Sequence, residues 1–298
     1  MNDEQTVPMM KNKKTIILLG FIIAILSAVA AATGIFHKEG SGNYEYLSIR
    51  NETVTIYGQG LYRHMSADVA IQGIAQDCVT LFIAIPMLLV ALLLLRKETL
   101  KRIFLLAGVL NYFFVTYLFY MNMAMYNALF IVYILLTSST FFAFALTLVG
   151  INIKSLPHHF NAHTPVKYIG GFLIFLSSSI ALLWLKTVLN PLFDGTIIPK
   201  ATEHYTTLTV QGFDLSIFLP IAFLSGVLLI KKNPFGYFMG TITLVFLCFM
   251  MTALVAKIIA MANAGISVVP VVFIIPAFLV LTVFSTVLLF KNIKNEIE

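Results

Sequence analysis

The chain of 298 residues is 59% hydrophobic and only 11% charged, with a mean hydropathy of +0.94. Soluble domains are about 45–50% apolar and about 25% charged, so this composition excludes a soluble globular protein and a disordered chain. Two cysteines exclude a disulfide scaffold, and the net charge of +6 comes from short basic clusters between apolar runs, which argues against a nucleic-acid-binding face.

Eight apolar runs are each long enough to cross a hydrocarbon core, which takes about 20 helical residues. Because the runs are continuous rather than alternating, they favour helices over a β-barrel. We therefore predict an all-α polytopic membrane protein with eight transmembrane helices. In chain order, the predicted spans are Thr15–Phe36, Val69–Leu95, Ile103–Met121, Ala128–Gly150, Tyr168–Leu189, Gly212–Ile230, Gly236–Ala262 and Val269–Phe290.

The first span resembles a signal peptide, because Lys11–Lys14 precedes the apolar run and Ala28-Val29-Ala30 lies near its end. The apolar segment of a signal peptide usually has about 7–15 residues, whereas this run has 22. We therefore expect the span to be retained as a transmembrane helix.

The distribution of Lys and Arg predicts the orientation of the spans. With an inside N-terminus, thirteen of these residues fall in cytoplasmic segments and only Lys38, Arg50, Arg63 and Lys200 fall outside. This asymmetry follows the positive-inside rule and predicts a cell-membrane protein with both termini in the cytoplasm. The cytoplasmic tails and linker are then 1–14, 151–167 and 291–298, with two short basic loops after the second and sixth spans, and the long outer loops are 37–68 and 190–211.

Residues 15–150 and 168–290 form two similar halves. The run Gly20–Ser27 resembles Gly171–Ser177 with one gap, and Asn152-Ile153-Lys154 resembles Asn292-Ile293-Lys294. Four spans per half mean that both halves insert the same way, which predicts a parallel repeat about an axis along the membrane normal. We expect two four-helix bundles side by side, with a shared site between them or at their outer mouths.

Four charged residues lie inside the spans, where ionisable groups are costly and indicate function. At about 1.5 Å per residue, Asp77, Lys186, Asp214 and Lys257 lie roughly 24–30 Å from the cytoplasmic ends of their helices, in one outer layer. One interpretation is that these side chains anchor the helix ends at the interface. The other is a polar vestibule in which at least one Asp lies within salt-bridge reach of Lys186, Lys257 or Arg63.

Further polar residues lie at the level of the charged layer. Gln72, Gln76 and Thr80 form a stripe at helical spacing. In the outer loops, 52–57 and 205–210 resemble strands and predict a small sheet over the vestibule, with Arg63 at its rim. The expected ligand-binding residues are Asp77, Asp214, Lys257, Lys186, Gln76, Gln72, Arg63, Asn111 and Tyr112.

Heme A synthases are similar in having a four-plus-four helix plan. This sequence departs from them because all six of its histidines lie outside the predicted spans, so no pair of axial haem ligands is present. No His, Cys or carboxylate spacing predicts a metal site either. We therefore expect no cofactor.

The leading hypothesis is a binding or transport protein for a small polar or zwitterionic ligand that enters from the outer face. Two alternatives remain open: an outer-leaflet enzyme acting on a lipid-linked substrate, with Asp77 or Asp214 as general base, and a non-catalytic sensor or assembly partner. The expected partners are the lipid bilayer and a small polar ligand or lipid, without nucleic acid. The sequence predicts neither the identity of the ligand nor the oligomeric state.

Overall fold

The computed structural model describes residues 10 and 12–294, and within them eight helical segments are long and apolar enough to span a membrane. The prediction of a polytopic, eight-helix membrane protein is thus confirmed. The segments are α1 (Lys13–Phe36), α2 (Ala67–Val79) with α3 (Ile85–Leu94), α4 (Leu100–Met123), α5 (Phe130–Val149), α6 (Val166–Leu189), α8 (Thr209–Phe213) with α9 (Leu219–Ile230), α10 (Pro234–Asn263) and α11 (Val271–Lys291). A short helix, α7 (Pro191–Asp194), follows α6.

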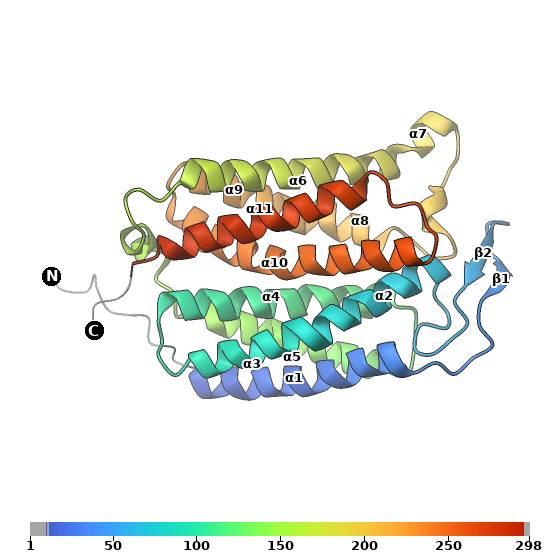
Figure 1. The fold of residues 1–298 in the computed structure, drawn as a ribbon, viewed down its shortest axis with the longest axis horizontal. Coiled ribbons are helices and arrows are strands. Elements are labelled where there is room, and N and C mark those ends of the chain that lie inside the picture. The colour runs from blue at the N-terminus through green and yellow to red at the C-terminus, as the bar shows by residue number, and fades with distance from the viewer. Residues whose placement is uncertain (1–9, 11, 295–298) are drawn as a thin grey trace.

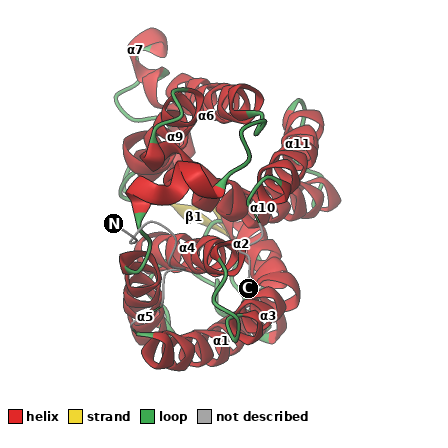
Figure 2. Cartoon of the chain, turned by 90° about the vertical axis from the view of Figure 1, so that its left-hand side faces the viewer, coloured by secondary structure: helices red, strands yellow, loops and turns green. Residues whose placement is uncertain are grey.

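The spans form two groups of four (Figure 2). The first group contains α1, α2 with α3, α4 and α5, and the second contains α6, α8 with α9, α10 and α11. In each group, helices that follow one another along the chain pack together, and the last helix also contacts the first. The groups meet where α10 packs against α2 and α4, so α4 and α10 form the centre of the molecule.

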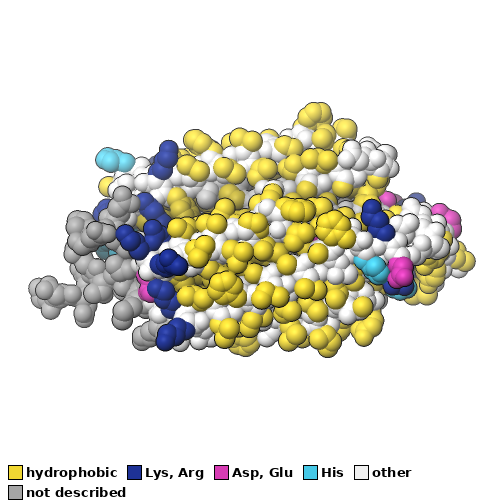
Figure 3. All heavy atoms as spheres, turned by 60° about the horizontal axis from the view of Figure 1, so that its bottom comes forward, with side chains coloured by type: hydrophobic (Ala, Val, Ile, Leu, Met, Phe, Trp, Pro, Cys, Tyr) yellow, Lys and Arg dark blue, Asp and Glu magenta, His cyan; other side chains and the backbone are white. Residues whose placement is uncertain are grey.

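The two ends of the bundle differ in charge. The hairpin end carries two short strands, and the end that we call the terminal end carries the start of α1 and the end of α11 (Figure 1). Lys and Arg side chains gather at the terminal end, and a broad apolar band covers the face between the ends (Figure 3). Large side chains such as Leu18, Phe82 and Phe273 are exposed on the helices. Since such a surface is unfavourable in water, it is typical of contact with lipid.

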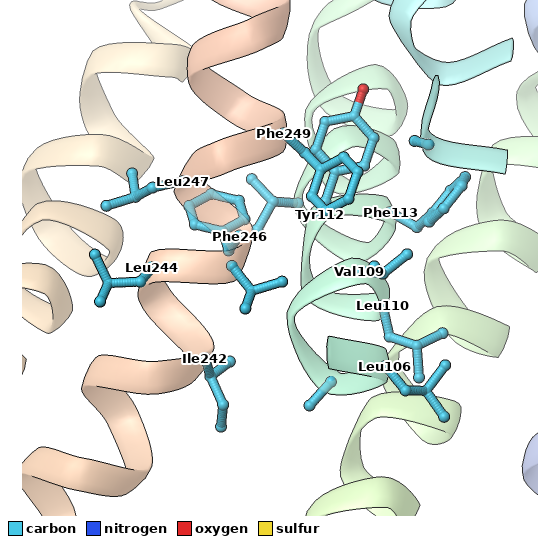
Figure 4. Close-up of a cluster of buried hydrophobic side chains, with 14 of the residues drawn as sticks. Leu106, Val109, Leu110, Tyr112, Phe113, Ile242, Leu244, Phe246, Leu247 and Phe249 are labelled. Atoms are coloured by element: carbon cyan, nitrogen blue, oxygen red, sulfur yellow. The ribbon is translucent and has the colours of Figure 1, made fainter. Parts of the chain in front are cut away.

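The contact between α4 and α10 is close because α4 carries a glycine at the crossing. A Cβ atom at Gly108 would overlap the side chain of Val245 on α10. Nearby, the rings of Tyr112 and Phe249 lie 5.6 Å apart between centroids, and Phe246 belongs to the same buried cluster (Figure 4). Small residues that allow helices to approach closely are the usual means of packing inside a membrane.

The second span of each group is interrupted by a π-helical turn. These turns are Thr80–Ala84, between α2 and α3, and Asp214–Phe218, between α8 and α9. A proline follows each turn at the same distance, as Pro86 and Pro220. Proline lacks a backbone N–H and crowds the preceding turn, which accounts for a local change in the helical hydrogen-bond pattern. The sequence predicted two uninterrupted spans here.

The loops at the hairpin end only partly match the sequence prediction. β2 (Thr53–Ile56) lies within the predicted strand and pairs antiparallel with β1 (Tyr44–Leu47), a partner that was not predicted. The predicted strand at 205–210 is wrong, because residues 205–207 form bends and residues 209 and 210 belong to α8. In this segment, the backbone carbonyl of Tyr205 accepts a hydrogen bond from the side chain of Arg50 and not from a neighbouring strand.

Candidate functional site: a cavity between the two helix groups

A cavity of about 460 Å³ lies between the two groups and is partly open. Its lining comes from both groups and includes the loop residues Tyr62 and Met65, so it reaches the hairpin end. On α10 the lining residues run from Thr243 to Met261, which corresponds to roughly 27 Å of helix at about 1.5 Å per residue. The cavity therefore extends from the hairpin end past the midpoint of α10.

Two opposite charges line the cavity toward the hairpin end. The indole N–H of Trp184 on α6 donates a 2.8 Å hydrogen bond to Oδ2 of Asp214. Lys257 on α10 interacts electrostatically with Asp214 and with Asp77. Among the described residues, no hydrogen bond within 3.5 Å and no ion pair within 4.0 Å involves the Lys257 ammonium group.

Asp77 has a different environment, because it is only 1% exposed and does not line the cavity. The hydroxyl of Tyr62 donates a 2.5 Å hydrogen bond to Oδ2 of Asp77, and that of Tyr120 donates a 3.0 Å bond to Oδ1. Both tyrosines line the cavity, so they lie on the side of the carboxyl group that faces the cavity. Behind it, a Cβ at Gly34 of α1 would overlap Oδ2. Asp77 is thus enclosed by tyrosine hydroxyls and the backbone of α1.

The predicted polar stripe on α2 is joined to α4 by hydrogen bonds. The amide of Gln76 donates to the Tyr112 hydroxyl at 2.7 Å and to Oγ1 of Thr116 at 3.3 Å. The Tyr112 hydroxyl is also 2.9 Å from Oγ1 of Thr80. Because buried polar groups are costly when unpaired, this network fixes Gln76 at the cavity wall.

The expected ligand-binding residues separate into three sets. Gln72, Gln76, Asn111, Asp214 and Lys257 line the cavity, whereas Asp77 and Tyr112 lie directly behind its wall. Lys186 and Arg63 are exposed and do not line it, and Nε of Arg63 donates to the Gly60 carbonyl instead.

The expectation of a salt bridge from either Asp is wrong. Within the described residues, the ion pairs are Lys13–Glu98 and His37–Glu39, and neither involves the charged layer. Hydroxyl and indole donors occupy the positions that we expected Lys or Arg to take.

Most of the cavity wall is apolar, which the predicted vestibule did not include. Apolar side chains from α4, α6, α9, α10 and α11 line its deeper part, among them Phe114, Leu176, Ala222, Phe246 and Ile275. Apolar pockets with a few converging polar groups are the usual form of small-molecule sites.

The two long loops at the hairpin end are tied together beside the cavity. The guanidinium of Arg50 donates to the carbonyls of Glu203 and Tyr205, both at 2.9 Å. The backbone N–H of Ser66 donates to the Tyr205 hydroxyl at 3.2 Å. Burial raises the pKa of Tyr205 to about 12, so its hydroxyl stays protonated at neutral pH. The first loop, which carries Tyr62, is thereby fastened to the second group.

The chain matches no protein-family model, no curated protein and no solved structure. Within the part of the chain that the structure describes, no group of three or more His, Cys, Asp or Glu side chains is arranged to hold a metal ion.

Three residues at the site were missed by sequence reasoning. Tyr62 and Tyr120 were not selected because tyrosines are ordinary at membrane interfaces. Trp184 carried a usable signal, since it is the only tryptophan in the chain and lies two residues before Lys186, in the charged layer.

Proposed function

We propose that this protein is a membrane binding protein whose cavity takes up a small ligand with a polar or zwitterionic group from the outer face. One observation carries the proposal: a cavity of about 460 Å³ is lined by Asp214 and Lys257, which lie near the hairpin ends of two different helices. Opposite charges at a partly dry site can hold the two charges of a zwitterion.

The proposal includes the orientation of the protein in the cell membrane. The basic terminal end faces the cytoplasm by the positive-inside rule, so the hairpin end faces outward. Single cysteines at Ser41 and Thr196, in a chain with Cys78→Ser and Cys248→Ser, should react with a membrane-impermeant maleimide on intact cells. A cysteine at Ser155 should react only after the cells are opened, and the reverse pattern would contradict the orientation.

Entry of polar molecules from outside can be tested at the cavity wall. Gln72→Cys, in the same cysteine-free background, should react on intact cells with charged methanethiosulfonate reagents, because Gln72 lines the cavity. Leu182→Cys is the matched control, since Leu182 on α6 is 68% exposed, does not line the cavity and faces the surrounding lipid. Absence of reaction at position 72, with a folded protein, would contradict the proposed function.

We also propose that the two helix groups are a parallel repeat. In support, each group has the same cyclic order of helix contacts and a π-helical turn before a proline. Ser27 and Ser177 are both buried and donate to the carbonyl four residues earlier. Superposition of the groups by a rotation near the membrane normal is the relevant measurement, and an axis in the membrane plane would contradict the repeat.

A further inference from the structure

We infer that the ligand of this cavity is a zwitterionic amphiphile with a single apolar chain, held with its head at Asp214 and Lys257 and its chain along the deeper wall. This inference rests on the proposed function and names the class of ligand. It departs from the sequence-based expectation, which considered the charged layer without the apolar wall beneath it.

The shape and polarity of the cavity argue for the apolar chain. Below the charged layer, the wall is formed mainly by apolar side chains over a large part of the roughly 27 Å spanned along α10. A small hydrophilic zwitterion would leave this wall without contacts. An alkyl chain would cover it, and each buried methylene stabilises the complex by about 0.8 kcal/mol relative to water.

Methionines line the path from the hairpin end into the cavity. Met65 comes from the first loop, Met123 from the end of α4 and Met261 from the end of α10, while Met250 and Met251 lie deeper. Methionine is unbranched and flexible, and it is over-used where an apolar surface must adapt to its partner. This lining suits the passage of a flexible chain better than the binding of a rigid polar molecule.

The anionic part of the head has one clear partner. Lys257 is the basic residue that lines the cavity, and no hydrogen bond or ion pair within the described residues occupies its ammonium group. A phosphate or carboxylate placed there would form a charge-assisted hydrogen bond, which is stronger than a neutral one.

The cationic part of the head has a partner of opposite charge and aromatic neighbours. Asp214 accepts only one hydrogen bond, from Trp184, so its other oxygen faces no donor within the described residues. Trp184 lies beside Asp214, and Tyr62 and Tyr120, which bond to Asp77, line the same cavity. Aromatic rings attract ammonium groups, especially quaternary ones. Asp214 and Lys257 form no ion pair within 4.0 Å of each other, so a zwitterionic head can pair with both.

The single tryptophan allows a direct binding experiment. Trp184 lines the cavity, and bromine atoms near an indole quench its fluorescence. The full chain in a maltoside detergent should be titrated with lysophosphatidylcholine that carries bromine on its acyl chain. We expect saturable quenching that unbrominated lysophosphatidylcholine reverses, whereas quenching that rises linearly with the probe would overturn the inference.

Substitutions test separately the binding of the ligand's head and the binding of its alkyl chain. Lys257→Met and Asp214→Asn should each weaken binding of the probe by about tenfold or more, the effect of losing one charged hydrogen bond. Asp214→Asn keeps an oxygen acceptor for the Trp184 indole. Ala222→Phe should fill the deeper cavity, and Leu224→Phe on the same helix is its matched control because Leu224 is exposed and lines no cavity. If Ala222→Phe is poorly folded, Ala222→Leu takes its place.

Competing probes distinguish the ligand classes. A brominated fatty acid, a brominated alkyltrimethylammonium and chainless glycerophosphocholine each lack one feature of the inferred ligand, so each should bind at least about tenfold more weakly. If glycerophosphocholine competes as well as the lysolipid and Ala222→Phe has no effect, the ligand does not require an alkyl chain. The further inference is then wrong, while the proposed function stands. If Gln72→Cys also fails to react with charged reagents, the proposed function fails as well.

Discussion

The two helix groups each place an aspartate at the hairpin end of their second span, but they treat it differently. Asp77 in the first group is enclosed by α1, Tyr62 and Tyr120, whereas Asp214 in the second group faces the cavity with one indole donor. Depth in the membrane is therefore a poor guide to the role of an acid. The number of donors that the protein supplies is a better one, because a fully satisfied carboxyl group has little to offer a ligand.

The largest expected effect is a loss of stability at Asp77, the enclosed aspartate. Gly34→Ala puts a Cβ against the Asp77 carboxyl group and 3.0 Å from the Tyr62 hydroxyl. Overpacking of this kind costs about 1–3 kcal/mol, and disturbance of the hydrogen bonds adds to it, so the melting temperature in detergent should fall strongly. Gly171→Ala is the control, because a Cβ there meets nothing within 4 Å and alanine favours the helix by about 0.5–1 kcal/mol. Equal melting temperatures for the two variants would show that Asp77 is not enclosed.

The next largest effect is the loss of stability when the hydrogen-bond donor to either aspartate is removed. Tyr62→Phe should lower the free energy of unfolding by about 1–3 kcal/mol, because it leaves a buried carboxyl oxygen without its donor. Trp184→Phe removes the donor to Asp214 and should cost less, since that carboxyl group lines a cavity that can admit water. Equilibrium unfolding in detergent measures both. A larger loss for Trp184→Phe would reverse our interpretation of the two sites.

A smaller effect concerns the connection between the groups at the hairpin end. Arg50→Lys keeps the charge but cannot donate to the carbonyls of Glu203 and Tyr205 in the same forked geometry. We expect a loss of about 0.5–1.5 kcal/mol and faster amide exchange in residues 200–208. Arg63→Lys is the control, because Arg63 bonds within its own loop. Unchanged exchange in the Arg50 variant would show that the loops are held by other contacts.

The smallest effect is a pH dependence at the terminal end of the first group. Burial raises the pKa of Glu98, but hydrogen bonds from the Met10 N–H (2.8 Å) and Lys13 Nζ (2.9 Å) outweigh it and hold the pKa below its usual value. Protonation therefore opposes the contact, which is present at neutral pH and is lost as the pH falls through the lowered pKa. Amide protection near Met10 should decrease in acid, and Glu98→Gln should abolish this pH dependence. Identical profiles for the variant and the wild type would contradict the assignment.

The sequence predicted the spans well because each depends on one local property. A run of about 20 apolar residues must be helical in lipid, whatever it packs against. The hairpin loops were harder to predict, because β1 is exposed along its whole length and carries no alternating pattern. The predicted strand at 205–210 is wrong for a related reason: Arg50 and Ser66, which are distant in sequence, bond to the carbonyl and the hydroxyl of Tyr205.

Counting residues along a helix predicts the depth of a side chain but not the direction in which it points. By this count, the four charges were expected to share a layer with Gln76 and Asn111. The same count does not say which way each side chain points around the helix axis. Lys186 is exposed, whereas Trp184, two residues earlier, lines the cavity. Only the packing of the helices decides between such neighbours.

The π-helical turns have a consequence for the rotational phase of their helices. A π turn contains about one residue more than an α-helical turn, so the segments on its two sides are rotated by roughly 100° relative to an unbroken helix. α2 can thus point Gln76 at α4 while α3, past the turn, packs Leu92 against Gly20 of α1. Deletion of one residue from Thr80–Ala84 would restore a common phase, and one of these two contacts would turn away from its partner.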